Sequence, residues 1–504
     1  MRRKKALKNI VSSLLLQITT IICGFITPSL IIKNYGSDVN GLISSITQFL
    51  SYIMLLEAGV GPVLKAALYK PIAEKDKEEI FALLRSGQKY FRTISYIFVI
   101  YIILLFLIYP IIVSTQFDFV FTCSLIIIMS ISTFFEYYMG ITYRIYLNAS
   151  QNTYIISCIQ LITLIVNTIV VVILIKLGFN VHIVKLVTTL IFVMRPILQY
   201  LYTSKVEKIH LNKKGKEAII NNKWDGLSQH IASTIHTNTD VSILTVFCKK
   251  ITEVSVYSVY YMVISGIRQL VRSFTNSVDS SFGDMLSRNE LDNLNKKFNL
   301  YETGYFVLVS IIYLCTLILI VPFVSAYTYG VTDVNYVRYA FAYLLVLGEF
   351  IWAIRQPYNE LIKAAGHFKE TKKGAWVEAI VNIIISTLMV MKYGLVGVAI
   401  GTFVSILIRT IEFVYYANKY ILKRQIIISI KKILLIIFET VLVSIFMCWI
   451  RLPLTVNYIS WIKQAIIVLI SVSFLIIGIV SFFYSGELKS VLNLLVRKKK
   501  NYEK

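Results

Sequence analysis

Runs of about twenty mostly apolar residues recur along the whole chain, and they limit what it can fold into. An α-helix that rises 1.5 Å per residue needs about 20 residues to cross the roughly 30 Å hydrocarbon core of a bilayer. Backbone polar groups in lipid must be paired within the protein, so spans of this length predict helices rather than a β-barrel. With 504 residues, 57% of them hydrophobic, the sequence predicts an all-α polytopic membrane protein.

Fourteen transmembrane helices are predicted from these spans. Their approximate bounds are 10–32, 41–64, 91–113, 119–147, 153–175, 182–204, 223–247, 252–285, 300–324, 335–361, 373–392, 395–418, 427–450 and 460–484.

The basic residues are distributed unevenly between the two sides of the predicted topology. Most of the 51 Lys and Arg residues lie at the two termini or in the loops after even-numbered spans. Basic loops remain on the cytoplasmic side, so both termini are predicted to be cytoplasmic. The abundance of Ile, Lys, Asn and Tyr suggests an AT-rich bacterial genome, and the expected membrane is the cytoplasmic (inner) one. The net charge of +24 therefore indicates anionic lipid headgroups rather than nucleic acid as the surface it meets. The six scattered cysteines, with no CxxC pair, indicate small buried side chains and no metal site.

A weak internal repeat divides the chain. At an offset of 215 residues, Ile165–Asn167 falls on Ile380–Asn382, and similar offsets align other helices. The offset spans six helices, so both copies should have the same orientation in the membrane. We therefore predict two pseudo-symmetric six-helix lobes, residues 1–204 and 205–424, followed by two appended helices and a basic tail in residues 425–504.

The hairpin formed by the seventh and eighth spans is unusually polar for lipid. Arg268 and Arg272 lie four residues apart on the eighth span and so share one face. Facing lipid, they would cost roughly 5–7 kcal/mol together, at about 2.5–3.5 kcal/mol each. We therefore expect them to face a cavity and to contact an anionic group such as a diphosphate. The alternatives are an ion pair between lobes, or an Arg272 side chain that reaches the inner interface.

Other polar residues of the same region have two interpretations. Asp240, with Asn238, could couple transport to Na⁺ or H⁺, or it could be the structural partner of an arginine. His230 and His236 could titrate near neutral pH and line the cavity, although hydrogen-bonded interior histidines are common. No cofactor or metal beyond such a coupling ion is expected.

The second span has a polar face as well. Gln48 belongs to a stripe at helical spacing, and Glu57 lies deeper, before Gly59, Gly61 and Pro62. Both are predicted to line a cavity or a gate, with a helix-end charge as the alternative for Glu57. Most of seven further charges inside spans are expected to form ion pairs: Glu136, Arg144, Glu349, Arg355, Glu378, Arg409 and Glu412.

Several of these segments resemble the Wzx-type polysaccharide and O-antigen flippases. The resemblance lies in Glu57–Pro62 with Lys65, Lys75-Asp76 and Glu79-Ile80, in Asn238–Asp240, and in Tyr257–Tyr260. The family belongs to the multidrug/oligosaccharidyl-lipid/polysaccharide exporter (MOP) superfamily. The resemblance implies two six-helix lobes, alternating access and a cationic cavity. It also implies movement of an undecaprenyl-diphosphate-linked oligosaccharide to the outer leaflet for capsule or O-antigen synthesis, alongside a polysaccharide polymerase and glycosyltransferases.

Three other functions remain open at this stage. A cation-coupled drug or metabolite antiporter of the same fold would favour carboxylates in its cavity, whereas arginines dominate the polar hairpin. A lipid II flippase carries arginines in its first helix by resemblance, and Asn9–Ile32 has none. A membrane polymerase or ligase would need a substantial outer loop, and the predicted outer loops are short. The chain is therefore predicted to be a transporter and not an enzyme.

Overall fold

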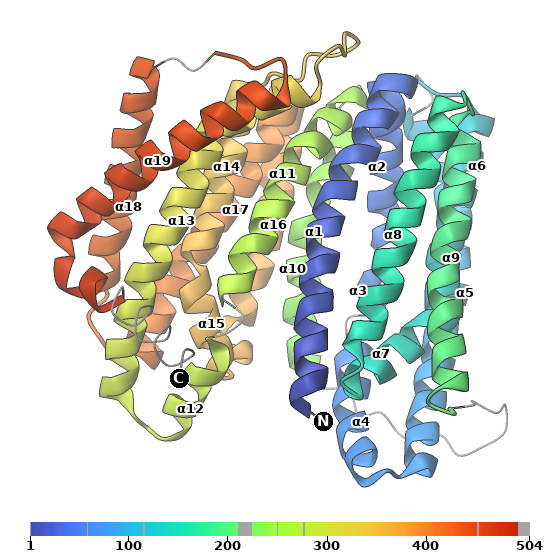
Figure 1. Cartoon of the computed structure of the whole chain (residues 1–504), viewed down its shortest axis with the longest axis horizontal. Helices are drawn as coiled ribbons and strands as arrows, with labels where there is room; N and C mark the ends of the chain where they lie inside the picture. The colour runs from blue at the N-terminus through green and yellow to red at the C-terminus, as the bar shows by residue number, and fades with distance from the viewer. Residues whose placement is uncertain are drawn as a thin grey trace. The chain divides into compact units, whose positions relative to one another are not determined.

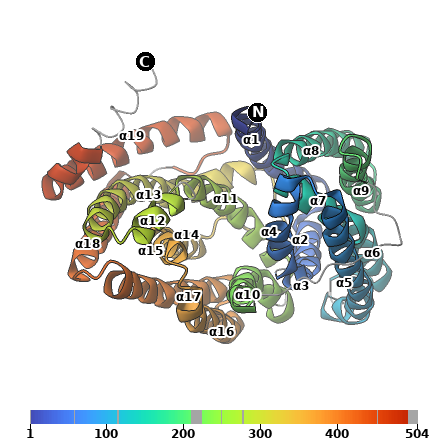
Figure 2. The ribbon, with the colours of Figure 1, turned by 90° about the horizontal axis from the view of Figure 1, so that it is seen from below.

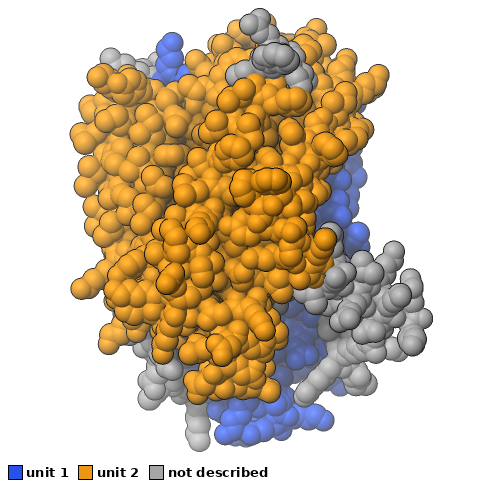
Figure 3. Space-filling view, turned by 90° about the vertical axis from the view of Figure 1, so that its left-hand side faces the viewer, with its two compact units in different colours: residues 1–258 blue, residues 259–504 orange. Residues whose placement is uncertain are grey.

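The structure is a computed structural model that describes residues 2–57, 59–113, 116–209, 224–248, 250–275, 278–450 and 453–491. Within these ranges every regular element is a helix, which confirms the all-α prediction (Figure 1). The chain divides into two compact units, Met1–Ser258 and Val259–Lys504, which are coloured separately in Figure 3. Each unit is described by itself. The repeat-based boundaries at 204 and 424 stay a prediction.

Unit 1 begins with one long helix and continues through a series of shorter and interrupted ones. Its helices are α1 (Arg2–Tyr35), α2 (Ser37–Ser51), α3 (Met54–Glu57), α4 (Val60–Glu74), α5 (Lys77–Val113), α6 (Phe119–Phe135), the π-helical turn η1 (Glu136–Gly140), α7 (Ile141–Ala149), α8 (Thr153–Lys176), α9 (Val181–Lys205) and α10 (Trp224–Phe247).

Helix α11 (Thr252–Thr275) contains the boundary between the units. The helices of unit 2 are α12 (Asp279–Ser287), α13 (Leu291–Tyr327), α14 (Tyr339–Ile354), α15 (Gln356–Ala364), α16 (Phe368–Tyr393), α17 (Leu395–Tyr416), the π-helical turn η2 (Ala417–Ile421), α18 (Ile427–Ile450) and α19 (Tyr458–Phe483).

Ten helical segments in the described part of the chain are long and apolar enough to cross a membrane. The other four predicted spans correspond to α10, α11, α14 with α15, and α18. Polar side chains lower the hydropathy of α10 and α11, while α14 is only 16 residues long. The chain thus contains a helix at each of the fourteen predicted spans.

Three predicted spans are broken rather than continuous. The span predicted at 41–64 is interrupted twice, between α2 and α3 and again between Glu57 and Val60. The span at 335–361 breaks at Arg355, where Pro357 occupies the first turn of α15 and supplies no backbone donor. The span at 252–285 is likewise two helices, α11 and α12.

Lipid-facing surface accounts for the exposed apolar side chains. Helix α1 exposes Leu7, Leu14, Ile18 and Ile22, each more than half exposed, because no protein covers that side. A water-soluble protein rarely leaves so large a continuous apolar surface uncovered. Figure 2 shows the helices of unit 1 end-on.

Candidate functional site

Unit 1 contains a cavity of about 480 Å³ among α2, α3, α6, α7, α8 and α9. Its charged lining residues are Glu57, Glu136, Arg144, Lys185 and Arg195. Hydroxyls and amides line it between these charges, including Thr47, Ser132, Thr133, Gln160, Thr188, Thr189 and Gln199. The volume lies in the range of about 300–1,000 Å³ that is usual for small-molecule pockets.

One end of the cavity is organised around Arg144. Its Nη1 donates to Glu136 Oε1 at 2.8 Å, and its Nη2 donates to Glu57 Oε1 at 3.3 Å. The Tyr137 hydroxyl also donates to Glu57 Oε2 at 3.0 Å. Glu57, predicted to line a cavity or a gate, therefore lies in the wall of this cavity as the acceptor of two donors.

The π-helical turn η1 places Glu136 in the wall. Such a turn adds a residue to the helix and is frequent at functional sites. At Gly140, a Cβ would lie 2.8 Å from Glu136 Oε2 and 2.9 Å from Pro196 Cβ. The missing side chain therefore lets η1 pack closely against α9.

Gln48 does not point into this cavity but into a polar seam between α2 and α10. Gln48 Nε2 donates to Asn238 Oδ1 at 2.9 Å, and the Tyr52 hydroxyl lies 2.7 Å from Ser242 Oγ. Further along, Ser45 and Thr245 hydroxyls lie 2.7 Å apart. Hydrogen bonds of this kind hold helices together in lipid.

The predicted coupling residue, Asp240, is buried beside the same seam. Its Oδ2 accepts a hydrogen bond from the Tyr257 hydroxyl at 2.9 Å, while Asn238 Nδ2 donates to the Thr234 backbone oxygen at 2.8 Å. His236 is also buried, whereas His230 is exposed with its Nδ1 3.2 Å from Thr234 Oγ1. Among the described residues, no group of three or more His, Cys, Asp or Glu could hold a metal ion.

In unit 2, the two arginines predicted to contact a diphosphate differ in their partners. Arg268 Nε donates to Glu349 Oε2 at 2.9 Å and its Nη2 contacts Glu349 Oε1, so the guanidinium is held in a two-bonded ion pair. Arg272 is exposed and forms no ion pair within the described residues. Both guanidinium carbons lie over the Trp352 ring, at 4.6 and 5.4 Å from its centre. Of the pair, only Arg272 keeps its donors for a ligand.

Several other buried charges of unit 2 form ion pairs. Arg355 Nη1 bonds Glu378 Oε1 at 2.6 Å, and Arg409 lies between Glu378 and Glu412. These pairs, with Arg144–Glu136 and Arg268–Glu349, confirm the expectation that most of the seven further span charges pair. The fully buried Glu302 binds Arg424 at 3.1 Å and Lys432 at 3.2 Å through its Oε2 atom.

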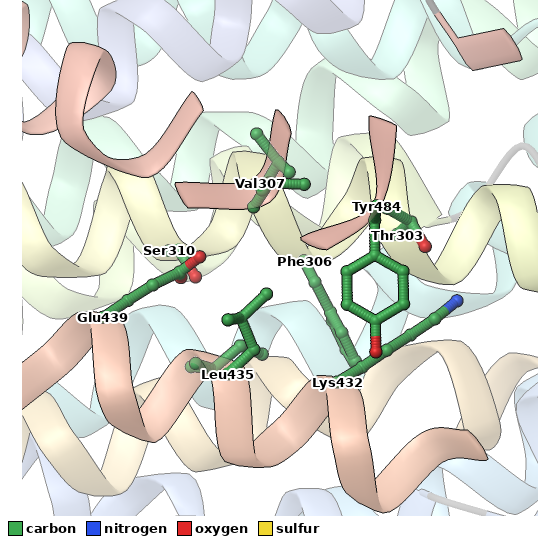
Figure 4. A pocket seen from close by; sticks show the side chains of 10 residues that line it. Thr303, Phe306, Val307, Ser310, Lys432, Leu435, Glu439 and Tyr484 are labelled. Atoms are coloured by element: carbon green, nitrogen blue, oxygen red, sulfur yellow. The ribbon is translucent and has the colours of Figure 1, made fainter. Parts of the chain in front are cut away.

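A small pocket of about 20 Å³ lies beside this last cluster, between α13, α18 and α19. Figure 4 shows Glu439 of α18 directed at Ser310 of α13, with Lys432 and Tyr484 further along. The volume is close to that of one water molecule. This pocket is too small for a substrate.

One side of the unit 1 cavity, formed by α9, was not predicted from the sequence. Helix α9 contributes Lys185, Thr188, Thr189, Phe192, Arg195 and Gln199 to the lining. Their spacing of three or four residues is the period of one helix face, so the stripe was visible in the sequence.

Comparison with protein-family models and with curated proteins found no match. Comparison with solved structures did. The lipid II flippase MurJ in an inward-closed conformation is similar at 18% identity, covering 95% of this chain and 100% of MurJ, with a TM-score of 0.68. An inward-facing multidrug-resistance MATE transporter of the MOP superfamily is similar at 13% identity, covering 82% and 99%, with a TM-score of 0.63. A MATE structure in a bent conformation has a TM-score of 0.52 at 14% identity, covering 83% and 96%. The chain therefore has the fold of MOP-superfamily transporters.

Proposed function

We propose that this chain is a flippase that moves an undecaprenyl-diphosphate-linked oligosaccharide from the cytoplasmic to the outer leaflet by alternating access, for surface-polysaccharide synthesis. It makes and breaks no covalent bond. The observation that carries the proposal is Arg272, a guanidinium on a membrane helix with no carboxylate partner among the described residues. A diphosphate is a natural ligand for such a group, because the planar fork of arginine matches phosphate oxygens.

In this proposal Arg268 has a positioning role and does not bind the diphosphate. Its ion pair with Glu349 fixes the guanidinium over Trp352, next to Arg272. The Glu349 carboxylate neutralises the Arg268 charge and occupies its donors, so Arg272 is the guanidinium that remains for an anion. Of the two arginines that the sequence predicts as diphosphate contacts, the proposal keeps only Arg272.

A lipid II flippase is the second candidate, and one observation favours it. MurJ covers 95% of this chain, against 82% for the multidrug transporter. A lipid II molecule also presents a diphosphate, so Arg272 suits both substrates. The antiporter alternative is less well supported, because the described ion pairs leave no carboxylate of the Arg268 cluster unpaired for a cationic drug.

Coupling to an ion is part of the proposal. Asp240 is a buried carboxylate of the polar hairpin, and its Oδ2 accepts a hydrogen bond from the Tyr257 hydroxyl. We assign it to proton or Na⁺ binding. The Asp240→Asn variant should then transport at a rate that no longer depends on either ion gradient. Gradient-dependent transport by this variant would exclude the assignment.

The test uses the full chain in proteoliposomes that contain a labelled undecaprenyl-diphosphate-linked oligosaccharide, with lipid II and ethidium in parallel samples. Flipping is measured as sugar that becomes accessible to a membrane-impermeant glycosidase. We expect Arg272→Gln to reduce flipping at least tenfold and Arg272→Lys to retain part of it, while the exposed control Arg288→Gln leaves it unchanged. Transport of ethidium alone, or full activity of Arg272→Gln, would overturn the proposal, and activity on lipid II alone would favour the second candidate.

A further inference from the structure

The cavity of unit 1 is lined along one side by a single face of α9, and this face carries two cations. Lys185 and Arg195 are ten residues apart, which corresponds to about 15 Å along the helix axis. Gln199 lies one turn beyond Arg195, and Phe192 lies one turn before it. The positive charge is therefore distributed along the cavity rather than gathered at one point.

Neither cation is neutralised in the way that Arg144 is. Lys185 forms no ion pair or hydrogen bond within the described residues. Arg195 donates from Nε to Thr163 Oγ1 at 2.8 Å, and its guanidinium stacks 4.1 Å from the centre of the Phe192 ring. Glu136 is the carboxylate that acts on Arg195 through space, but its nearest partner is Arg144 at 2.8 Å. The two Nη groups of Arg195 remain available to a ligand.

A buried acceptor beside Arg195 also lacks a partner. Gln199 is 1% exposed and lines the cavity, and its Oε1 atom makes no hydrogen bond. A buried polar atom without a partner is destabilising, because it has lost its hydrogen bonds to water. A ligand with a hydroxyl group next to its anionic group would satisfy Gln199 and Arg195 together.

The neutral part of the lining suits a sugar. Thr188, Thr189 and Gln160 offer hydroxyls and an amide, which are the groups that recognise sugar hydroxyls. The rings of Tyr137 and Phe192 offer apolar faces of the kind that pack on a pyranose ring. A simple inorganic anion would use the cations and leave these groups unused.

We propose that the cavity of unit 1 binds an acidic sugar residue, a hexuronate, whose carboxylate is held by Arg195 and whose hydroxyls contact Gln199 and the α9 threonines. Lys185 adds positive potential that attracts the carboxylate into the cavity. That this sugar belongs to the transported oligosaccharide rests on the proposed function. Binding of the sugar itself does not.

Binding is tested on the purified full chain in detergent, by the rise in thermal unfolding temperature as D-glucuronate is titrated. D-glucose and inorganic phosphate serve as matched compounds, one lacking the charge and the other lacking the sugar. A ligand that binds only the folded state raises its stability by RT ln(1 + L/Kd), where L is the free ligand concentration, so the shift at a given concentration reports the affinity. We expect glucuronate to give the largest shift and to bind at least tenfold more tightly than glucose.

Substitutions of the lining residues test where glucuronate binds. Arg195→Gln should weaken glucuronate at least tenfold without changing the response to glucose, and Arg195→Lys should restore part of the difference. Lys185→Gln should weaken glucuronate less, and Lys176→Gln, an exposed lysine at the end of α8, should have no effect. Size-exclusion profiles and unliganded unfolding temperatures establish that each variant is folded.

Three results would overturn the proposal: equal shifts with glucuronate and glucose, an equal shift with phosphate, or a folded Arg195→Gln variant that still prefers glucuronate. The measurement involves no lipid-linked substrate and no gradient. A chain that binds glucuronate but flips nothing would refute the proposed function alone, and a chain that flips but does not bind it would refute this inference alone.

Discussion

The two units differ in how they treat charge inside a membrane protein. In unit 2, Arg268, Arg355, Arg409, Arg424 and Lys432 have side chains no more than 12% exposed, and each contacts a carboxylate. In unit 1, Lys185 and Arg195 line a cavity of about 480 Å³ without a carboxylate in contact. In unit 2, a pocket of about 20 Å³ lies beside the Glu302 cluster.

One pair of positions makes the difference concrete. At the offsets of the predicted repeat, Thr163 corresponds to Glu378 (378 − 163 = 215) and Arg195 to Arg409 (409 − 195 = 214). In both units the arginine Nε faces that partner, at 2.8 Å from Thr163 Oγ1 and 3.7 Å from Glu378 Oε2. A hydroxyl satisfies one donor but leaves the charge, whereas a carboxylate cancels it. At this pair of positions, unit 2 therefore uses its arginine to hold helices together, and unit 1 keeps its arginine charge for a ligand.

The largest effect is expected where a buried pair of unit 2 is broken. Glu349→Gln leaves Arg268 uncompensated at a nearly buried site and should cost about 3–5 kcal/mol of unfolding free energy. The quantity is measured by titrating the detergent-solubilised protein with SDS. The double variant Arg268→Gln, Glu349→Gln should recover much of the loss, and Asp284→Asn, in an exposed pair, should change little. A loss below 1 kcal/mol would remove the structural role assigned to this pair.

A packing change in unit 1 should have the next largest effect. Gly140→Ala places a methyl group 2.8 Å from Glu136 Oε2 and 2.9 Å from Pro196 Cβ, and should cost about 1–3 kcal/mol. Gly24→Ala is the matched control, because a Cβ at Gly24 has nothing within 4 Å. The same SDS titration compares them. Equal stability of the two variants would mean that η1 and α9 do not pack as closely as described.

Breaking an ion pair in unit 1 should cost less than in unit 2. Glu57→Gln removes the 3.3 Å contact with Arg144, whose side chain is 30% exposed and still bonded to Glu136. We expect a change under about 1 kcal/mol in the SDS titration. A loss of unfolding free energy as large as that of Glu349→Gln would contradict the difference drawn between the units.

The smallest effect on stability is expected when the unit 2 arrangement is copied into unit 1. Thr163→Glu brings a carboxylate to Arg195, as Glu378 does for Arg409. Unfolding free energy should stay within about 1 kcal/mol, because the new pair offsets the cost of a larger buried side chain. Glucuronate binding should nevertheless be lost, since the guanidinium is neutralised. Retained preference for glucuronate over glucose would show that Arg195 charge is not what binds it.

Most of the fold could be predicted from the sequence, because span length and apolar composition are local properties. The fourteen spans follow from them directly. The breaks were harder to predict. Gly59, Gly61 and Pro62 indicate one break in the helix. The interruption between Ser51 and Met54 contains no glycine or proline from which it could be predicted.

The candidate sites were less predictable, because partners lie far apart in sequence. Arg268 and Glu349 are separated by 81 residues, so a free guanidinium and a paired one look alike in the sequence. The polar face of α2 was visible, yet Gln48 meets Asn238 in a seam while Ser51 lines the cavity. Which side of a helix faces which neighbour depends on packing angles that residue spacing alone does not give.

The interruptions on either side of α3 have a consequence for how this short helix is held. Where the regular helix pattern stops, phenolic groups from α5 bind backbone oxygens: the Tyr101 hydroxyl donates to Phe49 O at 2.9 Å and the Tyr90 hydroxyl to Leu56 O at 3.0 Å. Side chains of a neighbouring helix thus satisfy backbone groups at the breaks. The segment that ends in Glu57 is therefore attached to α5 at both ends, and removing either phenol oxygen should loosen that attachment.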